Sequence, residues 1–393
     1  MIIHRPYRDQ FYAPLRHKLR ILQALAYGLS QFIPHCPICT CRDDGASTGG
    51  KFKLPDFRQV GYYLPNNREP MIAKPPTLED VAQAAGVSAA TISRCINTPE
   101  RVAKGTRLRI QAAIDALGYT PNFGGRALAT RRTNIIGAVI PSMANSVFAG
   151  GIQAFQEVLA REKVTLLIGS TNYAPDYGCE RIQTLISHGA GGMLLVGSKR
   201  PDRTQQFLNS RRIPTLNVWC FRADSDQLYV GFDNFTAGED VAKLVLEYGH
   251  KTVAIVSGIC DGNDRAADRL AGMERIMNQP DNGARIVMVH QTKYSFDHAA
   301  KAFDTVIAQS PRPTAILAGN DVLAAGMIQR AKALGFGVPG DVSITGFDDI
   351  ALAQFVDPGL TTVRVPQVQM GQRAAEELLA EIREPGSGHS VEL

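Results

Sequence analysis

The sequence predicts an α/β protein with an N-terminal all-α helix-turn-helix headpiece and a larger core of two subdomains built on parallel sheets. A basic helical segment with a tight glycine turn occupies residues 71–119. From residue 134 onward, short β-branched runs alternate with helical segments. This alternation is typical of parallel sheets that are covered by helices on both faces.

Basic side chains are concentrated at the front of the 393-residue chain. Residues 1–70 hold ten Lys/Arg and five Asp/Glu, residues 71–132 hold nine and four, and the remaining residues hold 23 and 28. A basic module in front of an acidic one indicates a polyanionic partner for the front part alone. The alternative is a chance asymmetry of surface charge.

Residues 1–70 are predicted to form a poorly structured extension, because Gly, Asp, Ser and Pro dominate from Asp43 to Pro70. The stretch from His35 to Cys41 contains one C-x-x-C, which can be half of a zinc site, but no second Cys/His pair follows at a suitable spacing. We therefore expect no metal, and a zinc or redox role is the alternative. Since Met71 falls where a coherent domain begins, a further hypothesis places much of 1–70 upstream of the natural start.

Cysteine usage and hydropathy indicate a reducing compartment. Four of the seven cysteines stand singly in apolar or helical contexts, where thiols behave as small hydrophobes; they are Cys95, Cys179, Cys220 and Cys260. No stretch reaches the roughly 18 uninterrupted apolar residues of a membrane span, and the apolar run at 21–33 has no convincing cleavage site. We expect a cytoplasmic protein without a membrane partner.

The headpiece begins with Thr77-Leu-Glu-Asp80, a hydroxyl cap followed by an acid in the first helical turn. Gly86 supplies a turn, Ser88 caps a second helix, and a third helix stops at Gly118. Apolar side chains recur at helical spacing and are expected to face the core of this bundle; they are Val81, Ala82, Ala85, Ile92, Cys95, Ile96, Ile110, Ala113, Ile114 and Leu117.

The second helix is expected to enter the major groove of DNA with its N-terminal half. Thr91 and Ser93 carry short hydroxyls that suit phosphates or base edges, and Arg94 can donate two hydrogen bonds to guanine or phosphate. Alanines offer methyl contacts only. The predicted outward face comprises Ala89, Ala90, Ser93, Arg94 and Asn97. The alternative is the polar outer surface of any small helical bundle.

Eight short apolar runs after Thr133 are predicted to be strands. A long gap at 219–229 separates two sets of strand–helix units, which favours two similar subdomains. The runs are Ile135–Ile140, Val164–Ile168, Met193–Val196, Thr215–Val218, Val253–Val256, Ile286–Val289, Ala315–Leu317 and Val342–Ile344.

The sequence from Thr77 to Asn97, together with Thr106-Arg107 and Leu117-Gly-Tyr-Thr-Pro-Asn122, resembles the lac repressor/galactose repressor family over about residues 75–385. The resemblance implies an operator-binding domain at 71–119 and an effector-binding and dimerisation core at 134–393 with a periplasmic sugar-binding fold. It also implies a homodimer on a near-palindromic operator. The predicted DNA contacts are Thr77, Ser88, Ala89, Ala90, Thr91, Ser93, Arg94, Asn97, Asn122, Arg126 and Leu128.

In this family the segment that matches residues 120–133 is a hinge that becomes helical on DNA, and Leu128 matches its minor-groove wedge. Such a wedge costs stacking energy of a few kcal/mol and gains a bent duplex with more protein contact. Gly124 and Gly125 depart from the alanine-rich pattern, and each costs roughly 0.5–1 kcal/mol of helix stability relative to alanine. The alternative is a plain linker with an incidental leucine.

Effector contacts are expected where the strands end, because ligands of such sheets bind outside the carboxyl ends of the strands. The candidates that follow predicted strands are Asn145, Phe148, Arg265, Arg269, Tyr294, Asn320 and Asp348. The resemblance supports Arg269, Asn320 and Asp348 most directly. In the alternative interpretation Asn320-Asp321 caps the next helix and Asp348 holds a loop.

Two arginines near one pocket favour an anionic ligand, because a desolvated anion needs paired cations. The segments 141–148 and 230–235 resemble the gluconate-operon repressors of the family, which implies gluconate or a related sugar acid as the effector of a repressor of carbohydrate utilisation genes. Family members continue past their last helix into a further strand. This chain stops at Ser390-Val-Glu-Leu393, so we expect an exposed sheet edge in the second subdomain, through truncation or in a shortened variant.

A transport receptor and an enzyme are the two alternatives to a regulator. A solute-binding receptor for transport shares the core fold, but it has no headpiece and needs an export signal. An enzyme is not indicated, because the chain contains no Gly-x-Gly-x-x-Gly after a strand, no phosphate-binding loop and no His-Glu-x-x-His. The sequence therefore predicts a regulator without a cofactor.

Overall fold

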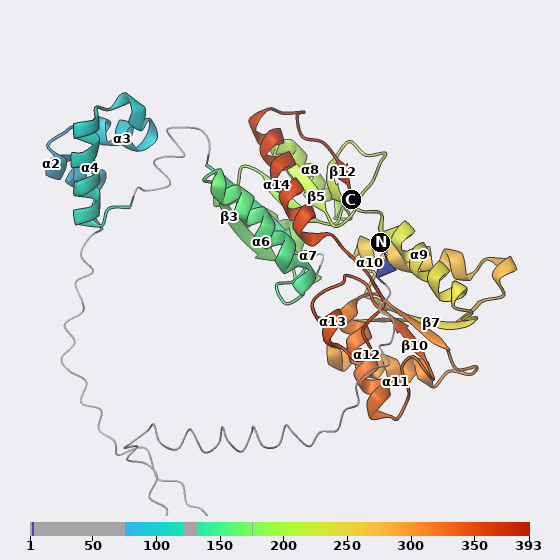
Figure 1. Ribbon diagram of the computed structural model, residues 1–393. Helices are drawn as coiled ribbons and strands as arrows, with labels where there is room; N and C mark the ends of the chain where they lie inside the picture. Colours follow the sequence, from blue (N-terminus) through green and yellow to red (C-terminus); the bar gives the residue numbers. More distant parts are fainter. Residues whose placement is uncertain (1, 4–74, 121–132, 175) are drawn as a thin grey trace, which may run out of the picture. The chain divides into compact units, whose positions relative to one another are not determined.

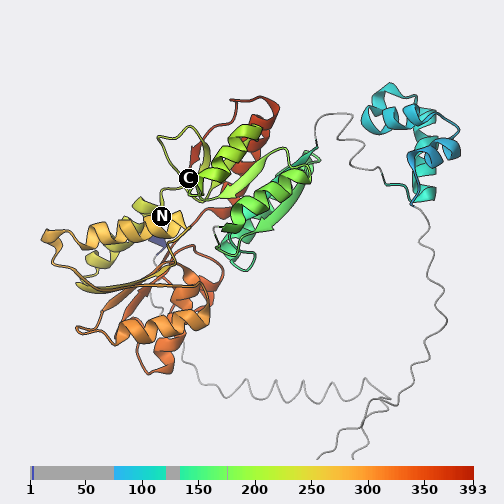
Figure 2. The same ribbon diagram turned by 180° about the vertical axis from the view of Figure 1, so that it is seen from behind.

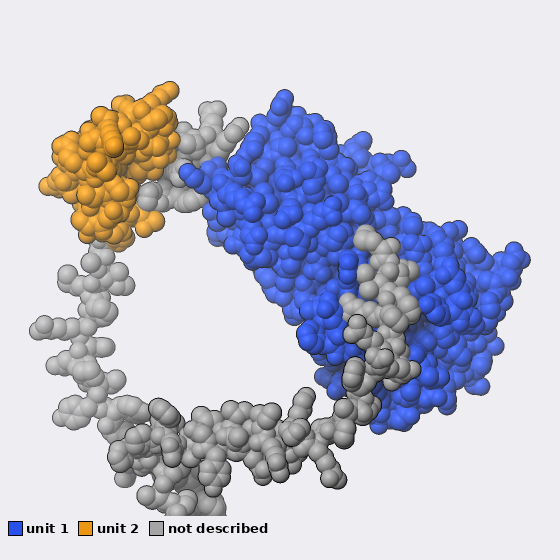
Figure 3. Space-filling view, viewed as in Figure 1, with its two compact units in different colours: residues 1–7, 122–393 blue, residues 8–121 orange. Residues whose placement is uncertain are grey.

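The computed structural model describes residues 2–3, 75–120, 133–174 and 176–393 (Figure 1). The chain divides into two compact units, residues 8–121 and residues 1–7 with 122–393 (Figure 3). The predicted hinge contacts Asn122, Arg126 and Leu128 lie outside the described residues, as does the C-x-x-C motif.

The described part of the first unit is the expected three-helix headpiece. It comprises α2 (Leu78–Ala85), α3 (Ala89–Asn97), a 3-10 turn (Pro99–Arg101) and α4 (Lys104–Leu117). Thr77 and Asp80 form a reciprocal capping box: the Asp80 N–H donates to the Thr77 hydroxyl and the Thr77 N–H donates to the Asp80 carboxylate. Gly86, at φ 63°, adopts the left-handed conformation that ends α2.

Val81, Ile92 and Ile110 are fully buried at the centre of the headpiece. Leu117, which helical spacing also assigns to this core, is 39% exposed. Gly118 ends α4 in the left-handed conformation, and it turns the buried ring of Tyr119 onto the core instead. Helical periodicity alone does not predict that Tyr119, beyond the end of the helix, packs on the core in place of Leu117.

The second unit contains two parallel sheets, each with its own helices (Figures 1 and 2). The first subdomain has the strand order β12-β6-β5-β4-β2-β3. Helices α6 and α14 pack against one face and α7 and α8 against the other. Its elements are β2 (Ile135–Ile140), α6 (Ser146–Arg161), β3 (Thr165–Ser170), α7 (Asp176–Ser187), β4 (Met193–Val196), α8 (Asp202–Arg211), β5 (Thr215–Val218), β6 (Leu228–Gly231), α14 (Gln367–Arg383) and β12 (Val391–Glu392).

The second subdomain has the strand order β10-β9-β7-β8. The short strands β1 (Ile2–Ile3) and β11 (Thr362–Val363) pair antiparallel with each other. The remaining elements are α9 (Asn234–Glu247), β7 (Thr252–Gly258), α10 (Asp264–Met277), a 3-10 turn (Pro280–Asn282), β8 (Arg285–Thr292), α11 (Phe296–Ile307), β9 (Ala315–Ala318), α12 (Asp321–Ala333), β10 (Ser343–Thr345) and α13 (Leu352–Phe355).

All eight predicted runs form strands, which confirms the α/β class and the division into two sheets. Two expectations were wrong. The region interpreted as a gap, 219–229, contains the first two residues of β6, which begins at Leu228 and belongs to the first sheet. The last residues also do not leave a strand missing from the second subdomain: they form β12, which pairs in parallel with β6 at the edge of the first sheet, and the Leu393 N–H donates to the Gly231 carbonyl over 2.8 Å. A two-residue strand carries too short a pattern to be recognised in sequence.

Close packing of α6 on α14 generates the first prediction. A Cβ added at Gly371 would overlap the carbonyl oxygen of Gly151, whereas one added at Gly178 on α7 would meet nothing within 4 Å. Gly371→Ala should therefore lower the free energy of unfolding by about 1–3 kcal/mol through overpacking. Gly178→Ala should raise it by roughly 0.5–1 kcal/mol through helix propensity. Urea unfolding of both variants measures this, and a shift of both midpoints in the same direction would contradict the packing.

Candidate functional site

Helix α3 presents a narrow polar face to solvent. Ala90, Arg94 and Asn97, which are spaced by four and three residues, are exposed on it. Ser93 is half-buried and its hydroxyl accepts a weak hydrogen bond from the Asn97 amide over 3.4 Å. Arg94 is therefore the one cation on the described part of this face, and its side chain is exposed to solvent.

The other predicted headpiece contacts have structural roles in the described residues. The Ser88 hydroxyl accepts from the Thr91 N–H over 3.2 Å and bonds to the Thr91 hydroxyl over 2.9 Å, so both belong to the cap of α3. Thr77 belongs to the capping box of α2. Ala89 was expected to face outward, but it is half-buried and packs against the headpiece core, because the short turn at Gly86 sets the first turn of α3 against that core.

The structure brings all seven predicted effector residues around one small cavity. The cavity lies at the carboxyl ends of strands from both subdomains, as the rule for parallel sheets requires. Its lining comprises the predicted Asn145, Phe148, Arg265, Arg269, Tyr294, Asn320 and Asp348, and also Val147, Tyr173, Trp219 and Asn263. We call this space the interdomain cavity.

Arg269, on α10, is held rigidly at this cavity. Its Nε donates to Asn234 over 2.8 Å and its Nη1 donates to the Gly319 carbonyl over 2.9 Å. The guanidinium carbon lies 3.8 Å from the centre of the Phe347 ring. The nearest carboxylate is Asp348, whose Oδ1 is 3.8 Å from Nη1. Arg269 is 7% exposed, so its charge is largely removed from water.

Asp348 lies in a strained backbone conformation at φ 117°. Burial raises the pKa of its carboxyl to about 8, against the opposing effect of Arg269. The group is therefore mainly protonated at neutral pH. Arg269 consequently has no fully ionised counter-ion beside it in the described structure.

Two buried donors at the cavity have no hydrogen-bond partner among the described residues: Asn320 Nδ2 and Trp219 Nε1. The Asn320 side chain does cap α12, because its Oδ1 accepts from the Leu323 N–H over 2.9 Å, but this uses only one end of the amide. A buried donor without an acceptor is costly, and a ligand oxygen would satisfy it. The capping interpretation of Asn320 thus leaves room for ligand contact.

Phe148 and Asn145 are also engaged within the protein. Phe148 meets the Trp219 ring edge to face with a centroid distance of 5.2 Å. The Asn145 side chain caps α6 through the Val147 N–H over 3.3 Å and donates to the Tyr173 hydroxyl over 3.3 Å. These contacts fix the wall of the cavity that the first subdomain provides.

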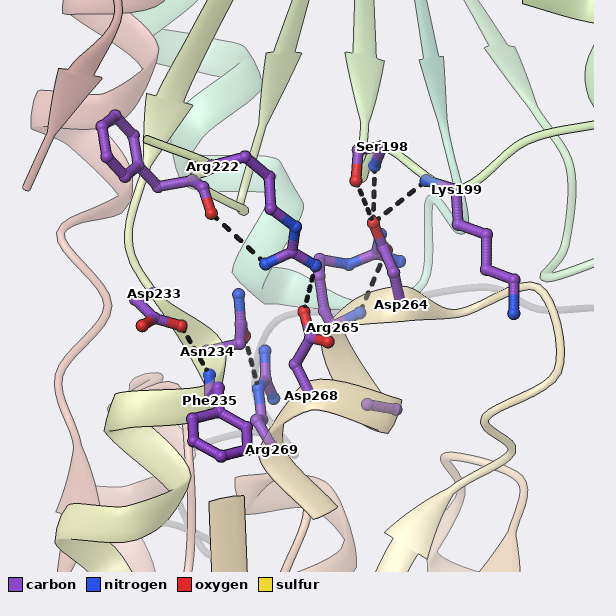
Figure 4. A network of polar contacts seen from close by, with 12 residues as sticks. Ser198, Lys199, Arg222, Asp233, Asn234, Phe235, Asp264, Arg265, Asp268 and Arg269 are labelled. Atoms are coloured by element: carbon purple, nitrogen blue, oxygen red, sulfur yellow. Dashed lines mark hydrogen bonds and ion pairs between the residues drawn. The ribbon is translucent and has the colours of Figure 1, made fainter. Parts of the chain in front are cut away.

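Polar contacts join the two subdomains beside the cavity (Figure 4). Asp264, at the start of α10, accepts from the Ser198 N–H over 2.6 Å, from the Ser198 hydroxyl over 2.9 Å and from the Lys199 N–H over 3.1 Å. Its other oxygen accepts from Arg265 over 2.7 Å. One turn further along α10, Asp268 accepts from Arg222 over 2.5 Å.

Sequence reasoning missed Trp219 and Asp264. Trp219 directly follows β5, so the rule that located the other candidates also applies to it, and its left-handed backbone (φ 61°) is not visible in sequence. Asp264 precedes a predicted contact, but its role depends on the loop after β4, which is 65 residues away along the chain. No local sequence pattern predicts that Asp264 pairs with a loop so far away along the chain.

A helix-turn-helix unit joined to a two-subdomain unit with a polar cavity defines the class of DNA-binding regulators that carry a ligand-binding core. The family model described as bacterial regulatory proteins, lacI family, matches residues 77–122. The model described as a periplasmic binding protein-like domain matches residues 242–393.

Similar proteins agree with this class. The HTH-type transcriptional regulator GntR of Escherichia coli (strain K12) is 30% identical over 313 residues, covering 80% of this chain and 94% of that protein. The HTH-type transcriptional repressor PurR of Proteus mirabilis (strain HI4320) is 32% identical over 308 residues, covering 78% and 90%. A solved lacI-family transcriptional regulator from Silicibacter pomeroyi gives a TM-score of 0.74 at 25% identity, covering 81% and 97%.

The chain belongs to the lacI family of bacterial regulatory proteins, and it is a DNA-binding transcriptional regulator with a ligand-binding core. The predicted family, fold class and regulatory function are confirmed at this level. Within the described residues, no helix is both long and apolar enough to span a membrane.

The buried Asp348 carboxyl generates a pH prediction. Its pKa is about 8 in the folded protein and near the ordinary 3.8 when unfolded, so the folded state retains a proton that the unfolded state has lost. The contribution of Asp348 to the free energy of unfolding therefore decreases as pH rises from about 4 to 8. Asp348→Asn should remove this part of the dependence of the free energy of unfolding on pH. Thermal unfolding of both proteins across this range measures it, and parallel pH profiles would show that Asp348 is not protonated.

Proposed function

We propose that this regulator represses genes of carbohydrate utilisation and that a sugar acid, gluconate or a close relative, binds in the interdomain cavity. The observation that carries this proposal is the buried Arg269, which lies 3.8 Å from Asp348, a carboxyl group whose pKa burial raises to about 8. A ligand carboxylate would supply the missing counter-charge. Arg265 contributes less than the sequence suggests, because Asp264 already neutralises it.

The rest of the cavity suits a polyhydroxylated acid. The unpaired donors of Asn320 and Trp219 need oxygen acceptors, which sugar hydroxyls provide. The cavity is small as described, so the two subdomains would have to move apart slightly to admit a sugar acid. The segments 141–148 and 230–235, which resemble gluconate-operon repressors, contribute Val147 and Phe148 to the lining and Asn234 to the support of Arg269.

On the DNA side, we propose that α3 enters the major groove and that Arg94 carries the main base contact of this helix. The capping roles of Ser88 and Thr91 leave few other donors there. Two copies of the chain would read a near-palindromic operator as a homodimer in the cytoplasm, with Leu128 as the minor-groove wedge.

We propose further that the protein acts by binding rather than by catalysis, since the similar proteins are transcriptional regulators. A transport receptor with the same core fold is the second candidate. The headpiece, with its lacI-family match at residues 77–122, argues against it. Effector binding in the interdomain cavity would then change the affinity of the headpiece for DNA, which is an allosteric coupling between the two sites.

Separate substitutions test this division of labour. Arg94→Ala should weaken binding to a duplex selected in vitro by the wild-type protein about 5–150-fold, equivalent to the 1–3 kcal/mol of a base contact, and should leave effector affinity unchanged. Arg109→Ala, an exposed cation on α4, is the matched control. Arg269→Ala should retain duplex binding and lose the effector response. If either substitution impairs both functions in a folded protein, the assignment is wrong.

Calorimetry tests the effector class directly. Gluconate should bind to the wild-type protein and fail to bind to Arg269→Ala, because the variant has no cation for the carboxylate. Neutral glucose should bind weakly to both proteins. Circular dichroism checks that the variant is folded. Tight binding of glucose without binding of gluconate would exclude a sugar acid, while leaving the DNA-binding function untouched.

A further inference from the structure

A second pocket lies on the α7–α8 side of the first subdomain, at the carboxyl ends of β2 and β4, and Gly262 and Arg265 of the second subdomain also line it. Its volume is about 90 Å³, which is larger than that of the interdomain cavity, and it is open to solvent on one side. Val139, Ile182 and Leu195 supply an apolar wall, and these side chains belong to the core under α7 and α8. Among the described residues that line them, the two spaces have Tyr173 and Arg265 in common. We call this space the α8 pocket.

The charge of the α8 pocket is positive. Lys199 and Arg200 line it, and no Asp or Glu is among its described lining residues. Arg200 donates to the Gly197 carbonyl over 2.8 Å, to Asn217 over 2.5 Å and to Gln205 over 3.2 Å. All three acceptors are neutral, so this part-buried guanidinium is hydrogen-bonded without being neutralised. Desolvation lowers its pKa, which shows the cost of the missing counter-charge.

The amino end of α8 adds donors to the same pocket. Pro201 occupies the N-cap position, where it offers no side-chain acceptor to the first turn. Thr204, in that first turn, lines the pocket and is 1% exposed. Its hydroxyl has no partner among the described residues. An unpaired buried hydroxyl beside an uncapped helix start is the arrangement that an oxyanion would complete.

We propose that the α8 pocket binds a small organic phosphate, with the phosphate held by Arg200, Lys199, the first turn of α8 and the Thr204 hydroxyl. Two cations, a helix N-terminus and a hydroxyl suit a dianion with three free oxygens better than a single carboxylate. The apolar wall formed by Val139, Ile182 and Leu195 accommodates the organic part.

This site is linked to the interdomain cavity through one segment of chain. The N–H groups of Ser198 and Lys199 are bonded to Asp264 of the second subdomain, while the Lys199 and Arg200 side chains line the α8 pocket. A phosphate on this segment would therefore change how firmly the two subdomains are joined. The α8 pocket would let a second ligand act on the regulator, whatever the effector in the interdomain cavity is.

Calorimetry on the full chain tests the site with inorganic phosphate, glucose 6-phosphate and glucose as probes. Both phosphate probes should bind at millimolar concentration or below, glucose 6-phosphate more tightly than inorganic phosphate, and glucose should not compete with them. Lys199→Gln and Thr204→Val should each weaken phosphate binding at least several-fold. Lys301→Gln, which removes an exposed charge on α11, should leave it unchanged.

Two further readouts separate this site from the interdomain cavity and from general instability. Arg269→Ala should retain phosphate binding while it loses the proposed effector, so that failure of one site is distinguishable from failure of the other. Thr204→Val should unfold at or above the wild-type temperature without ligand, because it removes an unpaired hydroxyl. Absence of phosphate binding in the wild type, unchanged binding in both pocket variants, or its loss in Arg269→Ala would overturn the proposal.

Discussion

The arrangement of the core depends on one buried carboxylate, Asp264. It lies at the start of α10 in the second subdomain and accepts hydrogen bonds from Ser198 and Lys199 of the first. Burial raises the pKa of Asp264, but Arg265 and these donors outweigh that effect and hold it below the ordinary value, so the group stays ionised. Removing such a group from a buried pairing is expensive, because its partners lose their acceptor.

The interdomain cavity follows from this junction, since its walls come from both subdomains. Helix α10 supplies Asp264 and Asp268 to the junction, and it supplies Arg269 to the cavity. A change in the spacing of the subdomains therefore moves Arg269 relative to Asn145 and Phe148. The same loop after β4 forms part of the α8 pocket. Both spaces are therefore next to the contacts that join the two subdomains.

Sequence alone predicted the fold to the level of individual strands, because β-branched runs and helix caps are local signals. It also predicted the seven residues around the cavity, since each follows a strand or begins a helix at the same edge of a sheet. It did not predict the state of these residues. The protonation of Asp348, the neutralisation of Arg265 and the unpaired amide of Asn320 depend on burial and on partners far away in the chain. The strand β12 was missed because two residues carry no usable periodicity.

The fluorescence of Trp219 tests the role of Asp264 most directly. Trp219 is the single tryptophan of the chain, it lines the interdomain cavity and it is 2% exposed. Asp264→Ala should separate the subdomains, shift the tryptophan emission to longer wavelength and increase its quenching by acrylamide. Asp261→Ala, an exposed aspartate just before α10, should behave as the wild type. Identical emission and quenching in all three proteins would show that Asp264 does not hold the core closed.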